Sequence, residues 1–294
     1  FLQSQRIQLK RYQILQLYMI TGGIPHYLKE LRRGESIEQA IDRLCFAQDG
    51  LLREEFDNLY PALFDHPERH LCVVRALASK PSGMIRNQII EACPVSSGGS
   101  TTKLLEELVQ SGFVQQYLPF GKTTKEPVFK LSDEYTIFYL HFIENSKAAG
   151  EGAWVNQSKS QAYRTWCGFA FENICLKHVP QIKKGLGISG IYTEQSLWRS
   201  DSKDGGQGAQ IDMVLDRADN CINLIEIKFA NSDFVIDKKY AAELEAKQRV
   251  FAAKTKTRKS LFLTMLTVYG VVKNDYFHNT IQKELTMDAL FGNL

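Results

Sequence analysis

The residues best suited to chemistry lie in two short apolar segments of the C-terminal half of the chain. Asp212 sits inside Gln-Ile-Asp-Met-Val-Leu (residues 210–215), and Glu226 and Lys228 sit inside Ile-Glu-Ile-Lys-Phe (residues 225–229). Side chains two residues apart project from the same face of a strand. Glu226 and Lys228 therefore share a face, and a charged pair in such an apolar run needs a partner or a function.

These three side chains suit metal-dependent chemistry on a phosphate. If the two strands pair as a hairpin, Asp212 lies beside Glu226, and two adjacent carboxylates repel each other unless a cation sits between them. Mg²⁺ or Mn²⁺ suits such a site, because it takes carboxylate oxygens, keeps several waters and bridges to phosphate. Lys228 would then orient an attacking water and neutralise charge that develops on the phosphate. The alternative is a structural salt bridge between Glu226 and Lys228 on a partly solvated sheet face.

Residues 154–294 supply the elements that must hold these side chains. The pattern predicts an α/β domain that begins with a helix over residues 161–178. Strands are expected at 190–197, 210–215, 222–229 and 260–268, a helix at 238–253, and a further short strand near Gly270. The loop at residues 201–208 contains three glycines and is expected to be mobile.

Three segments of this half resemble the PD-(D/E)XK nuclease superfamily, which has the restriction-endonuclease-like fold. They are residues 168–172 (Gly-Phe-Ala-Phe-Glu), 210–212 and 225–228. The resemblance implies an αβββαβ core in which Asp212, Glu226 and the backbone carbonyl of Ile227 bind the metal. It also implies that Lys228 is the catalytic lysine and that Glu172 is an accessory acid from the first helix. The chain departs from the motif in one place, since no Pro-Asp precedes Asp212.

The N-terminal half predicts helices in two groups. Residues 1–65 form a helical segment with a first helix that ends at Gly22-Gly23, a short helix at 25–33 and a third helix capped by Ser36. Pro61 and Pro67 are expected to bracket a break. Residues 66–131 predict helices at 68–79, 84–92 and 100–111, the last capped by Ser100 or Thr101, and then strands at 113–118 and 128–131. Three helices followed by a hairpin is the order of a winged helix-turn-helix.

Residues 132–153 connect this segment to the nuclease-like domain at 154–294. The aromatic run at 135–143 predicts a buried inter-domain helix rather than a ligand site, and 146–152 is small and polar like a linker. The order from Leu-Tyr-Met-Ile-Thr-Gly-Gly-Ile-Pro-His-Tyr-Leu (17–28) onward resembles the C-terminal part of prokaryotic AAA-plus-type ATPases that end in such a domain. The resemblance covers nearly the full chain and implies a lid-like segment at 1–65 with an ATP-binding module before it. The pattern G-x-x-x-x-G-K-[ST] is absent, so we expect no ATP hydrolysis from this chain, which we take as part of a longer protein.

Charge is nearly balanced, with 36 basic and 33 acidic residues, and the whole excess falls in residues 151–294. A run without acids carries Lys247, Arg249, Lys254, Lys256, Arg258 and Lys259. Such a run is either a solvated helix face or a set of phosphate contacts. Lys103 on the third helix of the winged helix, and Lys122 and Lys125 in its wing, are further candidates for DNA contact. Glu106 and Glu107 beside Lys103 would repel phosphate, so a role as a spacer or protein contact stays open for this segment.

Composition excludes several other classes of protein. The chain is 44% hydrophobic and 23% charged, which excludes a disordered or coiled-coil chain. The six cysteines form no C-x-x-C pair, which fits reduced thiols in a cytoplasmic protein, and no apolar run approaches the ~20 residues that span a bilayer. We therefore expect a metal-dependent DNA phosphodiesterase with a winged helix from a larger ATPase. The alternative is an inactive DNA-binding or oligomerisation module that serves the ATPase, as a possible homo-oligomer.

Overall fold

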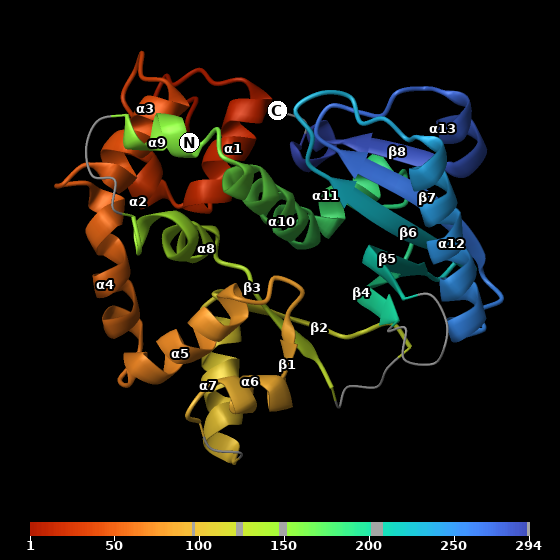
Figure 1. Cartoon of the computed structure of the whole chain (residues 1–294), viewed down its shortest axis with the longest axis horizontal. Helices are drawn as coiled ribbons and strands as arrows, with labels where there is room; N and C mark the ends of the chain where they lie inside the picture. Colours follow the sequence, from red (N-terminus) through yellow and green to blue (C-terminus); the bar gives the residue numbers. More distant parts are fainter. Residues whose placement is uncertain (96–97, 122–125, 147–151, 201–207, 293–294) are drawn as a thin grey trace. The chain divides into compact units, whose positions relative to one another are not determined.

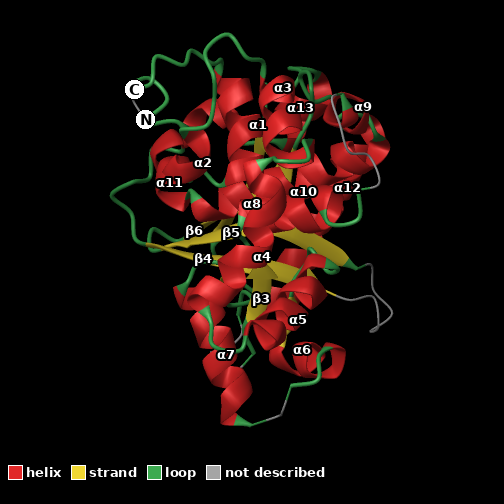
Figure 2. Cartoon of the chain, turned by 90° about the vertical axis from the view of Figure 1, so that its left-hand side faces the viewer, coloured by secondary structure: helices red, strands yellow, loops and turns green. Residues whose placement is uncertain are grey.

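The computed structural model describes residues 1–95, 98–121, 126–146, 152–200 and 208–292. The fold is a mixed α/β one, as expected, and the chain divides into two compact units (Figures 1 and 2). The first unit comprises Phe1–Gln116 and Val128–Ala170, and the second comprises Tyr117–Pro127 and Phe171–Leu294.

The first unit begins with short helices, two of which end or begin at the residues that the sequence predicts. These helices are α1 (Arg11–Thr21), α2 (Pro25–Leu28), α3 (Ile37–Ile41), the π-helix η1 (Asp42–Phe46) and α4 (Leu51–Leu63). Helix α1 ends at Gly22, whose φ of 64° is the left-handed conformation that favours glycine. The Ser36 side chain accepts a hydrogen bond from the Gln39 N–H and caps α3, as predicted.

One expectation about these helices was wrong and another was confirmed. The helix predicted to begin at Pro25 ends at Leu28 rather than Arg33. The break that Pro61 and Pro67 were expected to bracket is present at residues 64–66, between the end of α4 at Leu63 and the helix that begins at Pro67. Pro61 itself lies inside the last turn of α4. A proline in the last turn of a helix removes only one backbone hydrogen bond, so its position near the end of α4 limits the cost.

The rest of the N-terminal half combines three helices with a small sheet. The elements are α5 (Pro67–Ala78), β1 (Met84–Ile85), α6 (Arg86–Ala92), α7 (Gly99–Gln110), β2 (Val114–Tyr117) and β3 (Val128–Leu131), and the strand order is β1-β3-β2. Met84 and Ile85 pair with β3 instead of starting a helix, so the helix predicted at 84–92 begins only at Arg86. Helix α7 is capped by Gly98 rather than by Ser100 or Thr101.

An aromatic core closes the first unit. It is built from α8 (Glu134–Phe138), the π-helix η2 (Tyr139–Ile143), α9 (Ala153–Gln157) and the first turns of α10 (Gln161–Lys177). Phe138 and Phe142 each make edge contacts with Trp154 and Trp166, at centroid distances of 5.1 to 5.7 Å. These side chains are all buried. The aromatic run at 135–143 is therefore helical core, as its composition predicts.

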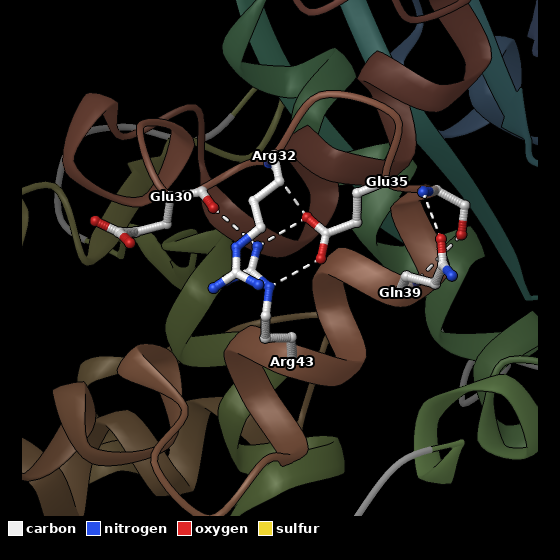
Figure 3. Close-up of polar contacts among 6 residues, drawn as sticks. Glu30, Arg32, Glu35, Gln39 and Arg43 are labelled. Atoms are coloured by element: carbon white, nitrogen blue, oxygen red, sulfur yellow. Dashed lines mark hydrogen bonds and ion pairs between the residues drawn. The ribbon is translucent and has the colours of Figure 1, made fainter.

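An Arg–Glu fork holds the turn between α2 and α3 against η1. Arg43 donates from Nε and Nη2 to the two oxygens of Glu35, each at 2.8 Å, and from Nη2 to the Glu30 carbonyl. Figure 3 shows the guanidinium facing this carboxylate, which also accepts from the Arg32 backbone N–H. Such bidentate pairs are stronger and more directional than single hydrogen bonds.

The second unit is built on a five-stranded sheet with the order β4-β5-β6-β7-β8. Its elements are the end of α10, α11 (Val179–Gly185), β4 (Thr193–Ser200), β5 (Ala209–Arg217), β6 (Cys221–Lys228), α12 (Lys238–Thr255), β7 (Ser260–Thr267), α13 (Asp275–Thr280), β8 (Lys283–Thr286) and the 3₁₀ helix η4 (Met287–Leu290). β4, β5 and β6 pair antiparallel, and β6, β7 and β8 pair parallel. The strand expected near Gly270 is only an isolated bridge between Phe234 and Val271, and the last strand, β8, was not predicted.

Helix α12 lies along one face of this sheet (Figure 1). Leu244 and Phe251 of α12 are fully buried in a cluster that includes Leu224 of β6 and Leu263 of β7. Phe120, from the segment between β2 and β3, packs against Phe251 with a centroid distance of 5.0 Å. This segment therefore contributes to the core of the second unit, a role that its sequence did not predict.

Candidate active site

The strands that carry the acidic residues pair as an antiparallel hairpin. Met213 of β5 lies opposite Ile225 of β6, and continuing this register by one residue places Asp212 opposite Glu226. The pairing of β5 with β4 shifts between Ser196 and Trp198, where β5 contributes one residue more than β4. Such a bulge re-aims the side chains of the longer strand and is common beside active sites. The shift lies between Ile211 and Val214, so the strand is irregular at Asp212.

Lys228 joins the two carboxylates on the same side of the sheet. Its ammonium lies 3.6 Å from Glu226 Oε2 and 4.0 Å from Asp212 Oδ2. Glu226 and Lys228 thus share a face of β6, as their spacing predicts. The Lys228 side chain is about one-third exposed, whereas that of Glu226 is almost completely buried. The lysine therefore stands between the buried acid and solvent.

Asp212 is held by the backbone of β6. Its Oδ2 accepts a hydrogen bond of 2.9 Å from the Ile227 N–H. The backbone of Ile227 thus contacts this carboxylate through its N–H. The role as a metal ligand that the superfamily resemblance implies for the Ile227 carbonyl stays a prediction. The bond leaves Oδ1 of Asp212 as the oxygen with more freedom to take another partner.

A fourth charged side chain enters the site from α12. The Lys247 ammonium donates to Glu226 Oε2 at 2.8 Å and lies 3.5 Å from Glu243, one turn earlier on the same helix. Its side chain is only 15% exposed. We expected Lys247 to contact nucleic acid as part of the basic run, but its ammonium instead lies on a buried carboxylate. The signal that could have indicated this is the spacing of Tyr240, Glu243 and Lys247, which share one helix face.

Burial dominates the electrostatics of Glu226. It raises the pKa of this carboxyl to about 7, with a further upward effect from Asp212, while Lys247 and Lys228 act in the opposite direction. Burial is the largest single effect on Lys247 and would lower its pKa, but the charge and hydrogen bond of Glu226, together with the charges of Asp212 and Glu243, raise that pKa overall. The pKa of Tyr240 is also raised, by burial first and then by the charges of Glu226 and Asp212. The charge of Asp212 therefore disfavours the ionised form of Glu226.

Glu172 approaches the same region from α10 without completing a ligand set. Burial raises the pKa of the Cys175 thiol, and the charges of both Glu172 and Asp212 raise it further, so both carboxylates are within electrostatic reach of this thiol. Glu172 itself is partly buried. Among the described residues, however, no group of three or more His, Cys, Asp or Glu side chains is arranged to hold a metal ion.

An open groove of about 750 Å³ runs beside the carboxylates, between β5 and α12. Asp212 lies in its wall together with Glu243 and Lys247. Two further basic residues, Lys239 and Arg249, also line it. Lys239 was not among the predicted site residues, although it lies on the exposed side of the helix that carries the basic run. The groove gives a ligand access to Asp212.

The rest of the basic run divides into two groups. Lys259 is engaged internally, because its ammonium donates to Asp216 at 2.5 Å and to the Arg217 carbonyl at 2.9 Å. The others are exposed, namely Arg249, Lys254, Lys256 and Arg258. Arg249 also lies 3.6 Å from Glu245. The C-terminal end of α12 is thus the exposed basic part of this run.

Of the candidate contacts in the first three-helix segment, only Lys103 can be placed. Lys103 is 79% exposed on α7 and lies 3.6 Å from Glu107, which also accepts a hydrogen bond from His70 at 2.9 Å. Lys103 and His70 both contact the Glu107 carboxylate, and these contacts reduce the repulsion that we expected it to exert on phosphate. Lys122 and Lys125, like most of the glycine-containing loop at 201–208, lie outside the described residues.

One buried atom bears on whether a divalent cation fits. Oε1 of Glu226 is buried and makes no hydrogen bond of normal geometry among the described residues, and the buried hydroxyl of Tyr240, which also makes none, lies close enough to interact with this carboxylate. An unpartnered buried carboxylate oxygen is costly, and a cation or an ordered water that it contacts would remove the cost. The donor set fits a hard cation that retains several waters, since it offers one oxygen each from Asp212 and Glu226. Lys247 is placed on the remaining oxygen of Glu226.

Comparisons of the chain with protein-family models, with curated proteins and with solved structures gave no match. Within the described part of the chain, no helix combines the length and apolar character needed to cross a membrane. The function must therefore be inferred from the site itself.

Proposed function

We propose that this protein is a metal-dependent phosphodiesterase that acts on DNA, with its site on β5, β6 and α12. The observation that carries the proposal is the meeting of Asp212, Glu226 and Lys228 on one face of the sheet, with a buried carboxylate oxygen of Glu226 that makes no hydrogen bond of normal geometry among the described residues. Two acids and a lysine beside an open groove suit the hydrolysis of a phosphodiester, whose charge must be neutralised as the bond breaks.

The roles follow from where each side chain lies. Asp212 and Glu226 would hold Mg²⁺ or Mn²⁺, which supplies a Lewis acid and activates water when bound. Lys228, close to both acids and partly exposed, would orient the attacking water and neutralise charge on the phosphate. Lys239 and Arg249 in the groove would contact the flanking phosphates.

The order of elements supports this proposal. The run α10, β4, β5, β6, α12, β7 has the αβββαβ order that the resemblance to PD-(D/E)XK nucleases implies, apart from the short α11. In the first unit, α5, β1, α6, α7, β2 and β3 follow the order of a winged helix, and the small sheet brings β1 beside β3. We therefore also propose that this segment is a winged helix that contacts DNA through the exposed side of α7.

The proposal is tested by DNA cleavage in the presence of Mn²⁺. Supercoiled and single-stranded DNA would be incubated with the wild type, Asp212→Ala and Glu245→Gln, each purified identically. Glu245 is half exposed on α12 and outside the groove, so its variant controls for handling of the helix. We expect cleavage by the wild type and the control and none by Asp212→Ala. Equal cleavage by all three would identify a contaminant and reject the proposal.

One observation favours a second, non-enzymatic function. The charges of Asp212, Glu226, Lys228 and Lys247 cancel, and Lys247 already binds Glu226. In the non-enzymatic alternative, this neutral network has a structural role in the sheet and no catalytic one. The protein would then be a DNA-binding or oligomerisation module of an AAA-plus-type ATPase, attached to the ATP-binding part of a longer chain. Mn²⁺-independent DNA binding without cleavage, or a stable homo-oligomer without either activity, would support this function.

A further inference from the structure

Lys247 contacts one oxygen of Glu226, the carboxylate that a divalent cation would also need. Its ammonium lies 2.8 Å from Oε2 of Glu226, closer than the ammonium of Lys228 at 3.6 Å. The side chain of Glu226 is only 2% exposed, so this carboxylate is screened from solvent and depends on its neighbours for charge compensation. Lys247 is the nearest compensating charge.

A divalent cation cannot simply be added to this arrangement. When both carboxyls are ionised, Asp212 and Glu226 bring two negative charges, and Lys228 and Lys247 bring two positive ones. A further charge of +2 in a buried site would meet two ammonium groups within a few ångströms, where like charges repel strongly. One positive group must therefore leave as the cation enters, or the cation binds only weakly.

Lys247 already contacts a second carboxylate. Glu243 lies one helical turn before it, with its carboxylate 3.5 Å from the Lys247 ammonium, and the Glu243 side chain is 48% exposed. Both residues line the groove beside Asp212. The flexible four-carbon chain of a lysine allows its ammonium to turn from the buried acid toward the exposed one without moving the helix. Lys228 instead lies on the strand, near both acids at once.

We infer that Lys247 is an internal counter-ion that competes with a divalent cation for Glu226 and transfers to Glu243 when the cation binds. The inference rests on the proposed function, because it concerns the same carboxylates. Lys247 is a positioning residue in this account. It keeps Glu226 compensated when the site is free of metal and sets how tightly the site takes the cation.

The test measures Mn²⁺ binding directly, by the electron paramagnetic resonance signal of free Mn²⁺, on the 294-residue chain without DNA. Lys247→Met removes the competing charge while keeping the side-chain length, and we expect its affinity for Mn²⁺ to rise by about tenfold over the wild type. Lys247→Arg retains the charge and should stay near the wild type. Glu243→Gln removes the second carboxylate and should weaken binding severalfold.

The controls separate this inference from the proposed function. Asp212→Asn combined with Lys247→Met should lose the tight Mn²⁺ binding, which places the ion in this site. Glu243 is exposed, so its variant should fold even if Lys247→Met does not, and unchanged affinity in Glu243→Gln would contradict the transfer. Tight Asp212-dependent binding in the wild type that weakens in Lys247→Met would overturn the inference but leave the proposed function standing. No Asp212-dependent binding in any variant would overturn both.

Discussion

At the scale of single residues, the site depends on how the buried charge of Glu226 is compensated. Its side chain is buried, one of its oxygens lies on Lys247 and the other makes no hydrogen bond of normal geometry among the described residues. A buried charge of this kind is stable only while its compensating partners remain. Removing a partner should therefore be costly, whereas a surface ion pair on the same helix should contribute little.

Lys247→Met should destabilise the fold by about 2–4 kcal/mol, somewhat less than the loss of a sole partner because Lys228 remains near Glu226. The matched control is Arg249→Met on the same helix, whose pair with Glu245 is exposed and should contribute less than about 1 kcal/mol. Urea unfolding in metal-free buffer measures both values. Equal effects of the two substitutions would mean that Lys247 does not compensate Glu226.

The Arg43–Glu35 fork gives a pH-dependent prediction. The hydrogen bonds from Arg43 hold the pKa of Glu35 below its usual range. A carboxyl whose pKa is lower in the folded state contributes stability above its unfolded pKa of about 4.3, and this contribution disappears as pH falls through the folded pKa. Glu35→Gln should therefore cost about 1 kcal/mol at pH 7 and progressively less below about pH 4. Urea unfolding from pH 7 to pH 3 would measure this, and a cost that does not change with pH would contradict it.

At the scale of elements, the bulge in β5 and the packing of α12 bring the charged groups together.

The turn before β1 is sterically constrained, because Gly83 has a φ of 86° and a Cβ there would lie 2.5 Å from Val128 and 2.9 Å from the Phe129 carbonyl. Gly83→Ala should destabilise the first unit by about 2 kcal/mol or more. Gly99→Ala, where a Cβ meets nothing within 4 Å, is the control and should be nearly neutral. Thermal unfolding of both variants measures the difference, and equal stabilities would contradict the close packing of this turn on β3.

The exposed basic end of α12 leads to a prediction about DNA. Lys254, Lys256 and Arg258 are exposed there, and each phosphate contact that is lost should reduce the dependence of log affinity on log salt by about 0.9. Replacing all three with alanine should weaken DNA binding and flatten this dependence. Fluorescence anisotropy over a series of salt concentrations measures it. An unchanged slope would mean that this end of α12 does not contact DNA.

Sequence patterns predicted the parts of the site that depend on local alternation. The strand that carries Glu226 and Lys228 on one face follows from the period of two in strands, and the structure confirms it. The hairpin with the strand of Asp212 was assumed rather than predicted, and the structure contains it. The pairing of Lys247 with Glu226 could not be predicted in this way, because it depends on how α12 lies on the sheet. The short strand β8 and the role of Phe120 also depend on tertiary packing, which local patterns do not encode.

At the scale of the whole molecule, the chain has two compact units, and the candidate site lies entirely within the second. All of its charged groups come from β5, β6, α10 and α12. The first unit contributes a separate three-helix segment with an exposed lysine on α7. Phosphodiester hydrolysis and DNA binding without hydrolysis differ in what the second unit does to the DNA, whereas an oligomerisation module would do neither.

The central claim is that Lys228 and the two carboxylates hydrolyse a phosphodiester. The most direct measurement is the single-turnover rate of DNA cleavage at saturating Mn²⁺ by the wild type, Lys228→Met and the control Glu245→Gln. We predict that Lys228→Met lowers the rate by about 10²-fold or more while its DNA affinity changes little, and that the control cleaves like the wild type. Cleavage by Lys228→Met at the wild-type rate would contradict the claim.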